Sequence, residues 1–326
     1  MKKWTKLTAV MMAAAMALTA CGGNDAADDA AAGDTYTVGI IQQLEHPALD
    51  AATEGFQDKL TELLGEDKVT FDYQNAQGEQ TNCTTIATKF VSNKVDLIMA
   101  NATTALQAAA AATGDIPIVG TSVTDYKTAG VVDSNEEPGR NVTGVSDLAP
   151  IDQQIELLLK LVPDTQKVGI VYCSAEPNSA YQAKLAEAEL DKAGVAWAEY
   201  TAADSNEVQS VVTKAVGECD ALYIPTDNTI ANNTEIVKNI AVPAGIPVIA
   251  GEENLCKGCG LATLSISYYD LGAKAAEMAY EILVNGAAPA QMPIGYVSDG
   301  ITEKYNTDIA EALGIAIPEN MVAIGK

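Results

Sequence analysis

The chain has 326 residues and a formal net charge of −25, and 48% of its residues are hydrophobic while 5% are aromatic. Its acidic residues are spread along the sequence and no basic patch is visible, which argues against nucleic acid or an anionic lipid surface as a partner. Spread acidity of this kind is typical of a solubilising surface, and the apolar fraction suffices for two domains with buried cores.

The first residues predict export. Three lysines within the first six residues precede an apolar run, 7–20, that is too short and alanine-rich for a stable membrane span. The run ends in Leu18-Thr19-Ala20-Cys21, the pattern of a bacterial lipobox. We therefore expect a signal peptide over 1–20 and lipid attachment at Cys21, whose several acyl chains would anchor the protein durably on the extracytoplasmic face of the membrane. The alternative is a secretory peptide cut elsewhere, with Cys21 incidental.

Small and polar residues fill 21–35 and predict a disordered tether. Loss of the three leader lysines would take the formal charge from −25 to −28.

Beyond the tether, β-branched apolar runs alternate with amphipathic stretches. We expect strands in the first half at 37–41, 69–73, 97–100 and 116–119, with helices such as 49–64 and 84–91 between them. The second half repeats the scheme with expected strands at 168–172, 197–200, 221–224 and 246–249. Alternation of strand and helix predicts an α/β fold with a doubly wound parallel sheet in each half.

The two halves also resemble each other. Asp96-Leu97-Ile98-Met99 corresponds to Asp220-Ala221-Leu222-Tyr223, and Ile116-Pro117-Ile118-Val119 to Ile246-Pro247-Val248-Ile249, at a separation of about 125 to 130 residues. A domain-sized duplication predicts two lobes with a cleft between them.

The expected lobe boundaries follow from this duplication. The first lobe is expected over 36–146 plus 264–290 and the second over 147–263 plus 291–326. A strand at 264–268 would return toward the first lobe, a helix at 270–283 would follow, 292–297 would cross back, and 307–313 would form a last helix. These crossings would be three hinge segments.

Polar clusters follow the expected strands in both halves, at 42–47, 101–104, 121–125, 174–179, 226–229 and 251–254. Right-handed crossovers bring the carboxyl ends of parallel strands to one edge of a sheet, so these clusters can line one crevice. Their hydroxyls, amides and carboxylates also suit helix N-capping, and both roles can coexist at one helix end.

Five motifs carry a resemblance to a known family: Glu45-His46-Pro47-Ala48-Leu49-Asp50, Tyr73 to Glu79, Asn141 to Asp147, Glu176 to Ser179, and Pro225 to Thr229. The chain resembles, over essentially its whole mature length, the ABC transporter substrate-binding family that includes tryptophan- and tyrosine-binding members. The resemblance implies a type I periplasmic-binding-protein fold without enzyme activity or cofactor. It further implies a monomer that binds an amino acid, with an aromatic one among the options, and delivers it to an ABC permease and ATPase.

For an α-amino acid we expect the carboxylate near Thr103, Thr104 and Thr121, and the ammonium near Asp227, with Glu176 and Glu45 as alternates. Asn178 and Ser179 would close over the carboxylate from the second lobe. Stacking partners for an aromatic side chain would be His46, Tyr268 or Tyr269. The full set of expected ligand-binding residues is Glu45, His46, Asn101, Thr103, Thr104, Thr121, Glu176, Asn178, Ser179, Asp227, Asn228 and Tyr268. Asn101, Thr104 and the pair Cys256 and Cys259 depart from the usual family pattern.

Other readings stay open. A ligand-sensing lipoprotein would use the same fold and cleft, and the solute could instead be a sugar or nucleoside. An exported enzyme would need a nucleophile and base that the sequence does not offer: His46 is the sole histidine and has no Cys or Asp motif at useful spacing. Cys256-x-x-Cys259 fits a local disulfide or two reduced thiols better than a zinc site, and the remaining cysteines 83, 173 and 219 are expected to be buried.

Overall fold

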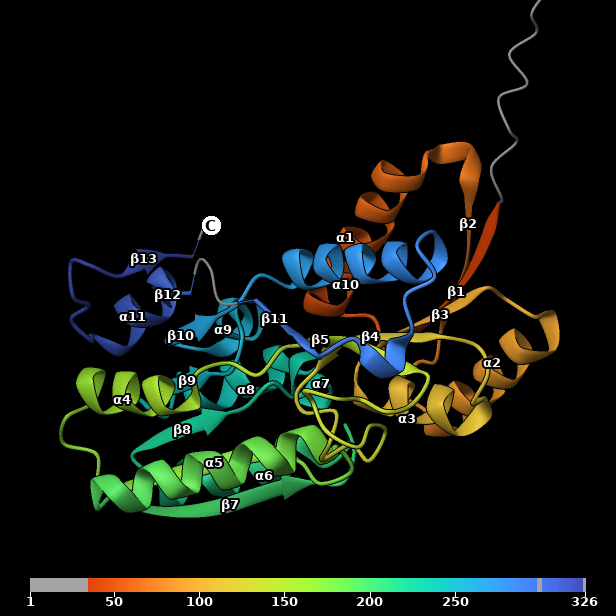
Figure 1. Cartoon of the computed structure of the whole chain (residues 1–326). Coiled ribbons are helices and arrows are strands. Elements are labelled where there is room, and N and C mark those ends of the chain that lie inside the picture. The colour runs from red at the N-terminus through yellow and green to blue at the C-terminus, as the bar shows by residue number, and fades with distance from the viewer. Residues whose placement is uncertain (1–34, 298–300, 325–326) are drawn as a thin grey trace, which may run out of the picture. The chain divides into compact units, whose positions relative to one another are not determined.

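The structure, a computed structural model, describes residues 35–297 and 301–324. The expected signal peptide, the tether before Thr35 and the lipid-attachment residue Cys21 lie outside these residues. The described residues form one compact unit. Within that unit two sheets form, as the alternating pattern predicts (Figure 1).

The first sheet is entirely parallel, with the spatial order β11-β5-β4-β3-β1-β2. Its strands are β1 (Tyr36–Gln42), β2 (Val69–Asn75), β3 (Leu97–Asn101), β4 (Ile118–Val123), β5 (Val142–Ser146) and β11 (Gly295–Tyr296). Helices α1 (Pro47–Leu64) and α10 (Tyr268–Leu283) cover one face, and α2 (Gln80–Asn93) and α3 (Thr103–Ala112) the other. Val38 and Ile40 pack under α1 and α10 while Ile41 packs under α2, which explains why β1 is apolar at nearly every position. This sheet and its helices are the first lobe.

The second sheet has the order β13-β12-β10-β9-β8-β6-β7, and only the β10–β12 pair is antiparallel. Its strands are β6 (Lys167–Cys173), β7 (Ala196–Ala202), β8 (Ala221–Ile224), β9 (Val248–Ala250), β10 (Ala262–Ser265), β12 (Thr302–Tyr305) and β13 (Val322–Ala323). One face carries α4 (Ile151–Leu161), α5 (Pro177–Ala193) and α11 (Thr307–Leu313). The other carries α6 (Val208–Glu218), α7 (Asn228–Ala231), α8 (Thr234–Ala241) and α9 (Glu253–Cys259). Two short 3₁₀ turns, η1 (Glu66–Lys68) and η2 (Pro289–Gln291), complete the elements. This sheet and its helices are the second lobe.

The two sheets share one winding order, since β2-β1-β3-β4-β5 corresponds to β7-β6-β8-β9-β10. In each sheet the chain first winds outward from the first strand to one side and then continues on the other side of that strand. The reversal lies between β1 and β3 in the first sheet and between β6 and β8 in the second. Ligands of open α/β sheets bind beside such switch points, outside the carboxyl ends of the strands. The duplication therefore gives the molecule two equivalent edges at which polar residues gather.

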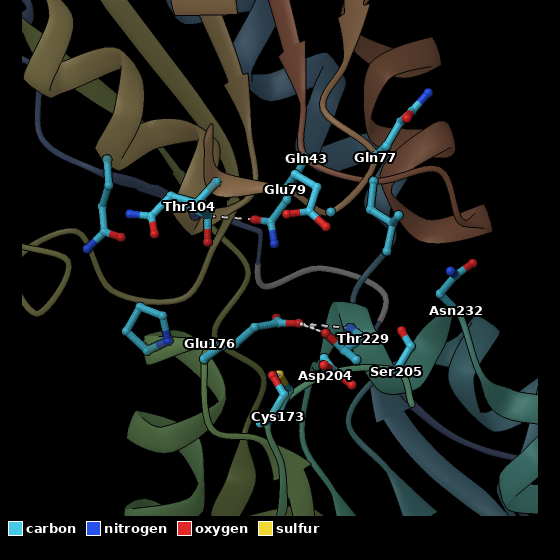
Figure 2. Close-up of a pocket in the computed structure, with 17 residues that line it drawn as sticks. Gln43, Gln77, Glu79, Thr104, Cys173, Glu176, Asp204, Ser205, Thr229 and Asn232 are labelled. Carbon is cyan, nitrogen blue, oxygen red and sulfur yellow. Dashed lines mark hydrogen bonds between the residues drawn. The ribbon is translucent and has the colours of Figure 1, made fainter. Parts of the chain in front are cut away.

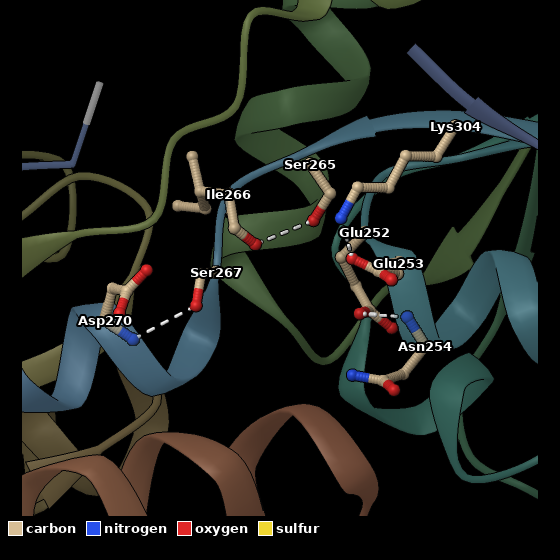
Figure 3. A network of polar contacts seen from close by, with 8 residues as sticks. All are labelled: Glu252, Glu253, Asn254, Ser265, Ile266, Ser267, Asp270 and Lys304. Atoms are coloured by element: carbon tan, nitrogen blue, oxygen red, sulfur yellow. Dashed lines mark hydrogen bonds and ion pairs between the residues drawn. The ribbon is translucent and has the colours of Figure 1, made fainter. Parts of the chain in front are cut away.

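Two of the expected crossings between lobes lie elsewhere. Residues 262–265 pair with β9 and β12, so this strand stays in the second sheet and the chain crosses after Ser265. Figure 3 shows this passage, where the Ser267 side chain accepts a hydrogen bond from the Asp270 backbone N–H at 3.2 Å and caps α10. At the third crossing, Tyr296 pairs with Ser146, so 292–297 adds an edge strand to the first sheet and the chain leaves this lobe later.

Candidate functional site

The polar ends of β1, β3 and β4 lie side by side, as expected from the parallel sheet. Gln42 is in register with Asn101, and Asn101 with Thr121. Backbone bonds continue past the strands, because the Gln43 N–H donates to the Asn101 carbonyl at 3.2 Å and the Ala102 N–H to the Thr121 carbonyl at 3.0 Å. Residues from three separate clusters of the sequence thus share one edge.

This edge concentrates buried polar atoms that lack a hydrogen-bond partner. Within the described part of the chain, the unpartnered side-chain atoms are His46 Nδ1, Asn101 Oδ1, Thr103 Oγ1, Thr121 Oγ1 and Ser122 Oγ. Each of these residues is at most 7% exposed. Leaving a buried polar group unpaired costs about 1–3 kcal/mol, so proteins keep few of them. All five lie in the first lobe, at the ends of β1, β3 and β4.

The backbone at the same edge is strained. Ala102 has a φ of 86° and Ser122 a φ of 56°, although neither is glycine. Such conformations cost on the order of 1–3 kcal/mol each and are concentrated at functional sites. Ala102 is also the N-cap of α3 and offers no side-chain cap, and in the first turn of this helix the Thr104 N–H donates instead to Gln43 Oε1 at 3.3 Å. Backbone strain and hydroxyls without a partner coincide at this helix end.

The second lobe contributes two buried carboxylates, Glu176 at 3% exposure and Asp227 at 2%. Asp227 accepts hydrogen bonds from the backbone N–H groups of Cys173 at 2.6 Å and Ile230 at 2.8 Å, and it caps α7. Burial raises the pKa of Asp227 to about 7, and the charge of Glu176 adds to the rise. Neither carboxylate takes part in an ion pair with a described lysine or arginine. The second lobe therefore presents excess negative charge.

Glu176 is held by the start of α7. Its Oε1 accepts hydrogen bonds from the backbone N–H and the hydroxyl of Thr229, both at 2.8 Å. Its Oε2 accepts from the backbone N–H of Asn228 at 3.1 Å and the side-chain amide of Asn228 at 2.7 Å, and from the Asn178 amide at 3.2 Å. Four N–H donors and one hydroxyl thus fix the orientation of the Glu176 side chain.

Among the described residues, side-chain hydrogen bonds from His46 and Gln182 join the lobes across the cleft. His46 Nε2 lies 3.0 Å from Asn228 Oδ1. On α5, the Gln182 amide donates to Thr124 Oγ1 at 3.1 Å, and its carbonyl accepts the Thr226 backbone N–H at 3.2 Å. These bonds link residues that flank the unpartnered hydroxyls, so the lobes meet around this cluster.

An open cavity of about 270 Å³ lies next to the cluster (Figure 2). Gln43, Glu79 and Thr104 line it from the first lobe, and Glu176, Thr229 and Asp204 from the second. Its lining is mostly amide, hydroxyl and carboxylate, and contains no lysine, arginine or histidine.

The structure distributes the expected ligand-binding residues over three environments. Thr104 and Glu176 line the cavity, and Thr103 and Asn178 line a small neighbouring pocket of about 10 Å³. The residues buried in or behind the junction of the lobes are His46, Asn101, Thr121, Ser179 and Asp227, and Asn228 joins them through its bond to His46.

Two expected residues lie apart from this junction. Glu45 is exposed and lies near Tyr73 of the first lobe. Burial, together with the charge of Glu45, raises the pKa of Tyr73 to about 12. The Tyr268 hydroxyl donates to Asp147 Oδ2 at 2.8 Å at the base of the crossings, which matches a packing role, and Tyr269 bonds Asp58 on the outer surface.

Sequence reasoning did not single out Ser122 and Gln182. Ser122 belongs to the polar cluster after β4, but only the structure shows its burial without a partner. Gln182 follows Asn178 and Ser179 at helical spacing, and this polar stripe on α5 was the available signal.

The sequence left open a local disulfide or two reduced thiols at Cys256 and Cys259, and in the structure both are reduced thiols. Cys83, Cys173, Cys219, Cys256 and Cys259 are all buried and unbridged in the described part of the chain. Burial raises the pKa of the Cys256 thiol, whose Sγ donates to the Gly260 carbonyl at 3.6 Å. These thiols are packing groups.

Comparison with known proteins decides the family. The profile of the family described as ABC transporter substrate binding protein matches residues 37–325. The chain belongs to this family. Its members are substrate-binding proteins, not enzymes, and they work on the extracytoplasmic side of the membrane. No helix in the described ranges is long and apolar enough to cross a membrane.

Individual relatives agree with this membership. A tyrosine-binding protein of Clostridioides difficile is 40% identical over 85% of this chain and 82% of its own length. A Streptococcus ABC domain solved in complex with L-Trp has 34% identity and a TM-score of 0.86, covering 89% of this chain and all of the other. The ligand-free, open structure of a substrate binding protein from Clostridium difficile has 40% identity and a TM-score of 0.69 over 90% of this chain. The fold is the type I periplasmic-binding-protein fold.

Proposed function

We propose that this substrate-binding protein binds an α-amino acid between its lobes and that the preferred ligand is aromatic. The observation that carries the proposal is the juxtaposition of unpartnered hydroxyls with buried carboxylates. Thr103, Thr121 and Ser122 offer hydroxyls beside the N-terminus of α3, while Asp227 and Glu176 are buried carboxylates on the facing lobe. Hydroxyls and helix N–H groups suit a carboxylate, and a carboxylate suits an ammonium.

The charge distribution supports a zwitterionic ligand over a sugar. A buried, uncompensated carboxylate is costly, and a ligand ammonium close to Asp227 would relieve that cost on binding. A sugar or nucleoside would offer hydroxyls but no positive charge. The family relatives that bind tyrosine and L-Trp add support for an aromatic side chain.

The cellular setting is part of the same proposal. The lipobox at Leu18-Thr19-Ala20-Cys21 supports export and anchoring through a lipid on Cys21. The protein would act as a monomer and release its ligand to an ABC permease and ATPase, which would import it. The residues proposed to contact the ligand are Thr103, Thr121, Ser122, Asn178, Ser179, Asp227 and His46.

Calorimetric titration of the purified protein with each of the twenty amino acids tests the ligand class. Tyrosine, tryptophan or both should bind, and the bound ligand should raise thermal stability by RT ln(1 + [L]/Kd). No heat with any amino acid, together with a signal from a sugar or nucleoside, would overturn the proposal.

A matched pair of threonine variants tests the site. Thr121→Val removes a hydroxyl that has no partner, so it should weaken the ligand about tenfold without lowering the stability of the free protein. Thr143→Val is the control, because the Thr143 hydroxyl donates to the Met292 carbonyl at 2.8 Å away from the cleft. The control should lose about 1 kcal/mol of stability and keep its affinity. The reverse pattern would remove Thr121 from the site.

A further inference from the structure

His46 occupies a position that its role in packing does not explain. It is the one histidine of the chain, lies at the N-cap position of α1, and makes no side-chain capping bond there. The imidazole is 7% exposed. One ring nitrogen bonds across the cleft to Asn228, while the other, Nδ1, has no partner among residues 35–297 and 301–324.

The hydrogen-bond network determines the tautomer of His46. Glu176 Oε2 accepts the side-chain amide of Asn228 at 2.7 Å, and a carboxylate held by backbone N–H groups can only accept. The amide nitrogen of Asn228 must therefore point to Glu176, which turns its oxygen, Oδ1, toward His46. An amide oxygen is an acceptor, so His46 Nε2 has to carry the proton and donate.

The same logic defines the chemistry of Nδ1. Burial lowers the pKa of His46, outweighing the nearby carboxylates Glu176 and Asp50, so the ring is neutral at pH 7. A neutral imidazole with a proton on Nε2 has a lone pair on Nδ1. Nδ1 is thus a buried hydrogen-bond acceptor within the group of unpartnered atoms on the first lobe. Asn101 Oδ1 is a second one, because the Asn101 amide already donates to the Leu49 carbonyl at 2.8 Å and to Thr53 Oγ1 at 3.0 Å.

We propose that His46 couples ligand recognition to closure of the cleft: its Nε2–H donates to Asn228 of the opposite lobe while its Nδ1 accepts a hydrogen bond from an N–H or O–H group of the ligand. This inference rests on the proposed function and adds a chemical requirement to it, a donor group on the side of the ligand next to α1. A donor that engages Nδ1 holds the proton on Nε2 and so strengthens the bond between the lobes. Ligand binding and closure of the lobes therefore become cooperative through the imidazole ring of His46.

Nitrogen NMR of the ¹⁵N-labelled protein reads this ring directly, because a single histidine gives one pair of ring signals. With saturating tyrosine or tryptophan, Nε2 should show the shift of a protonated nitrogen and Nδ1 that of an unprotonated one displaced by an accepted hydrogen bond. Protonation on Nδ1, or an Nδ1 signal that the bound ligand leaves unchanged, would overturn the inference alone. Failure of every amino acid to bind would overturn the proposed function and this inference with it.

Two substitutions separate the two bonds of the ring. In His46→Gln the side-chain amide reaches the place of Nε2, so the interlobe bond survives and the ligand bond is lost. In His46→Asn the amide reaches the place of Nδ1, so an acceptor for the ligand remains and the interlobe bond is lost. Each variant should weaken the ligand roughly fivefold to tenfold, the worth of one neutral hydrogen bond.

A second mutation identifies which bond each variant retains. Asn228→Ala should weaken the ligand further in the His46→Gln background, where the interlobe bond persists, and much less in the His46→Asn background. Equal effects in both backgrounds would contradict the proposed roles. Gln153→Ala serves as the control, because Gln153 is exposed on α4 and does not line the cavity; it should leave the affinity within about twofold. Asparagine is a good N-cap residue, so the His46→Asn protein should fold.

Discussion

Asp227 and Glu252 are buried carboxylates whose acidity links folding to pH. Asp227 is 2% exposed and Glu252 3%, and burial raises the pKa of each to about 7. In the unfolded chain such groups titrate near 4. Between about pH 4 and pH 7 the folded protein therefore binds more protons than the unfolded chain, and its free energy of unfolding falls as the pH rises through that window.

The variant Asp227→Asn isolates one of the two carboxylates. The difference in unfolding free energy between wild type and variant should shrink from pH 5 to pH 7, by up to about 1.4 kcal/mol per pH unit. Urea unfolding of the ligand-free proteins at pH 5, 6 and 7 measures this difference, and Glu252 leaves part of the pH dependence in the variant. Parallel stability curves for the two proteins would show that Asp227 titrates normally.

The proposed binding of a ligand ammonium would explain why the fold keeps such a carboxylate. Its two oxygens accept the backbone N–H groups of Cys173 and Ile230, which the single oxygen of a side-chain amide could not both do, and its negative charge is what a ligand ammonium would require. Asp227, Ala102 and the hydroxyls without a partner each lower the stability of the fold, and all lie at the same junction of the lobes.

At the scale of elements, α1 and α10 approach each other through glycine. A Cβ at Gly272 would lie 1.9 Å from the Ala52 carbonyl oxygen, and one at Gly55 would lie 2.1 Å from the Tyr269 carbonyl oxygen. Both obstacles are backbone atoms, so the helices could accept a methyl group only by moving apart. This pair covers one face of the first sheet and sets the direction in which α1 delivers His46 to the cleft.

Gly272→Ala should therefore destabilise the protein by about 1–3 kcal/mol or more, as overpacking of a close contact does. Gly217→Ala is the matched control in α6, because a Cβ there meets nothing within 4 Å; it should be neutral or stabilising by up to about 1 kcal/mol. Thermal and urea unfolding give both numbers. A neutral Gly272→Ala would mean that the two helices are not in tight contact.

The sequence predicted elements well where local pattern decides them. The strand expected at 221–224 coincides with β8, and the helix expected at 307–313 with α11. The strand expected at 116–119 runs instead from Ile118 to Val123, because Thr121 and Ser122 look like loop residues although the strand continues through them. Their burial depends on the rest of the fold, which no local pattern contains.

The site was predictable to the same extent. Parallel strands bring their carboxyl ends together, so the clusters containing Thr103, Thr121 and Asp227 could be assigned to one cleft from sequence. The contact of Glu45 with Tyr73 depends on the packing within the first lobe, and the bonds of His46 to Asn228 and of Gln182 to Thr124 depend on which side chains meet across the lobes. Such contacts between distant segments follow from tertiary geometry alone.

At the scale of the whole molecule, the lobes are in a closed arrangement. The chain superposes on the L-Trp complex with a TM-score of 0.86 at 34% identity, but on the open, ligand-free relative with only 0.69 at 40% identity. We infer from the lower score of the more similar, open relative that its lobes are placed differently, as in the hinge closure of two-lobed binding proteins. The bonds from His46 and Gln182 across the cleft belong to this closed arrangement.

The proposed anchoring of the molecule would depend on one residue outside the two lobes, Cys21. If the lipobox is processed, Cys21 becomes the N-terminal residue and carries the lipid. A lipid with more than one acyl chain would make membrane attachment durable. In cells expressing the full chain, labelled palmitate should enter the protein, and the protein should sediment with membranes. Cys21→Ala should lose the label and leave the membrane fraction. Cys83→Ala, which alters a buried thiol of the first lobe, is the control and should keep both. Retention of label in Cys21→Ala would assign the lipid to another residue. If the unmutated protein sediments with membranes but carries no label, an uncleaved leader and not a lipid would be the anchor.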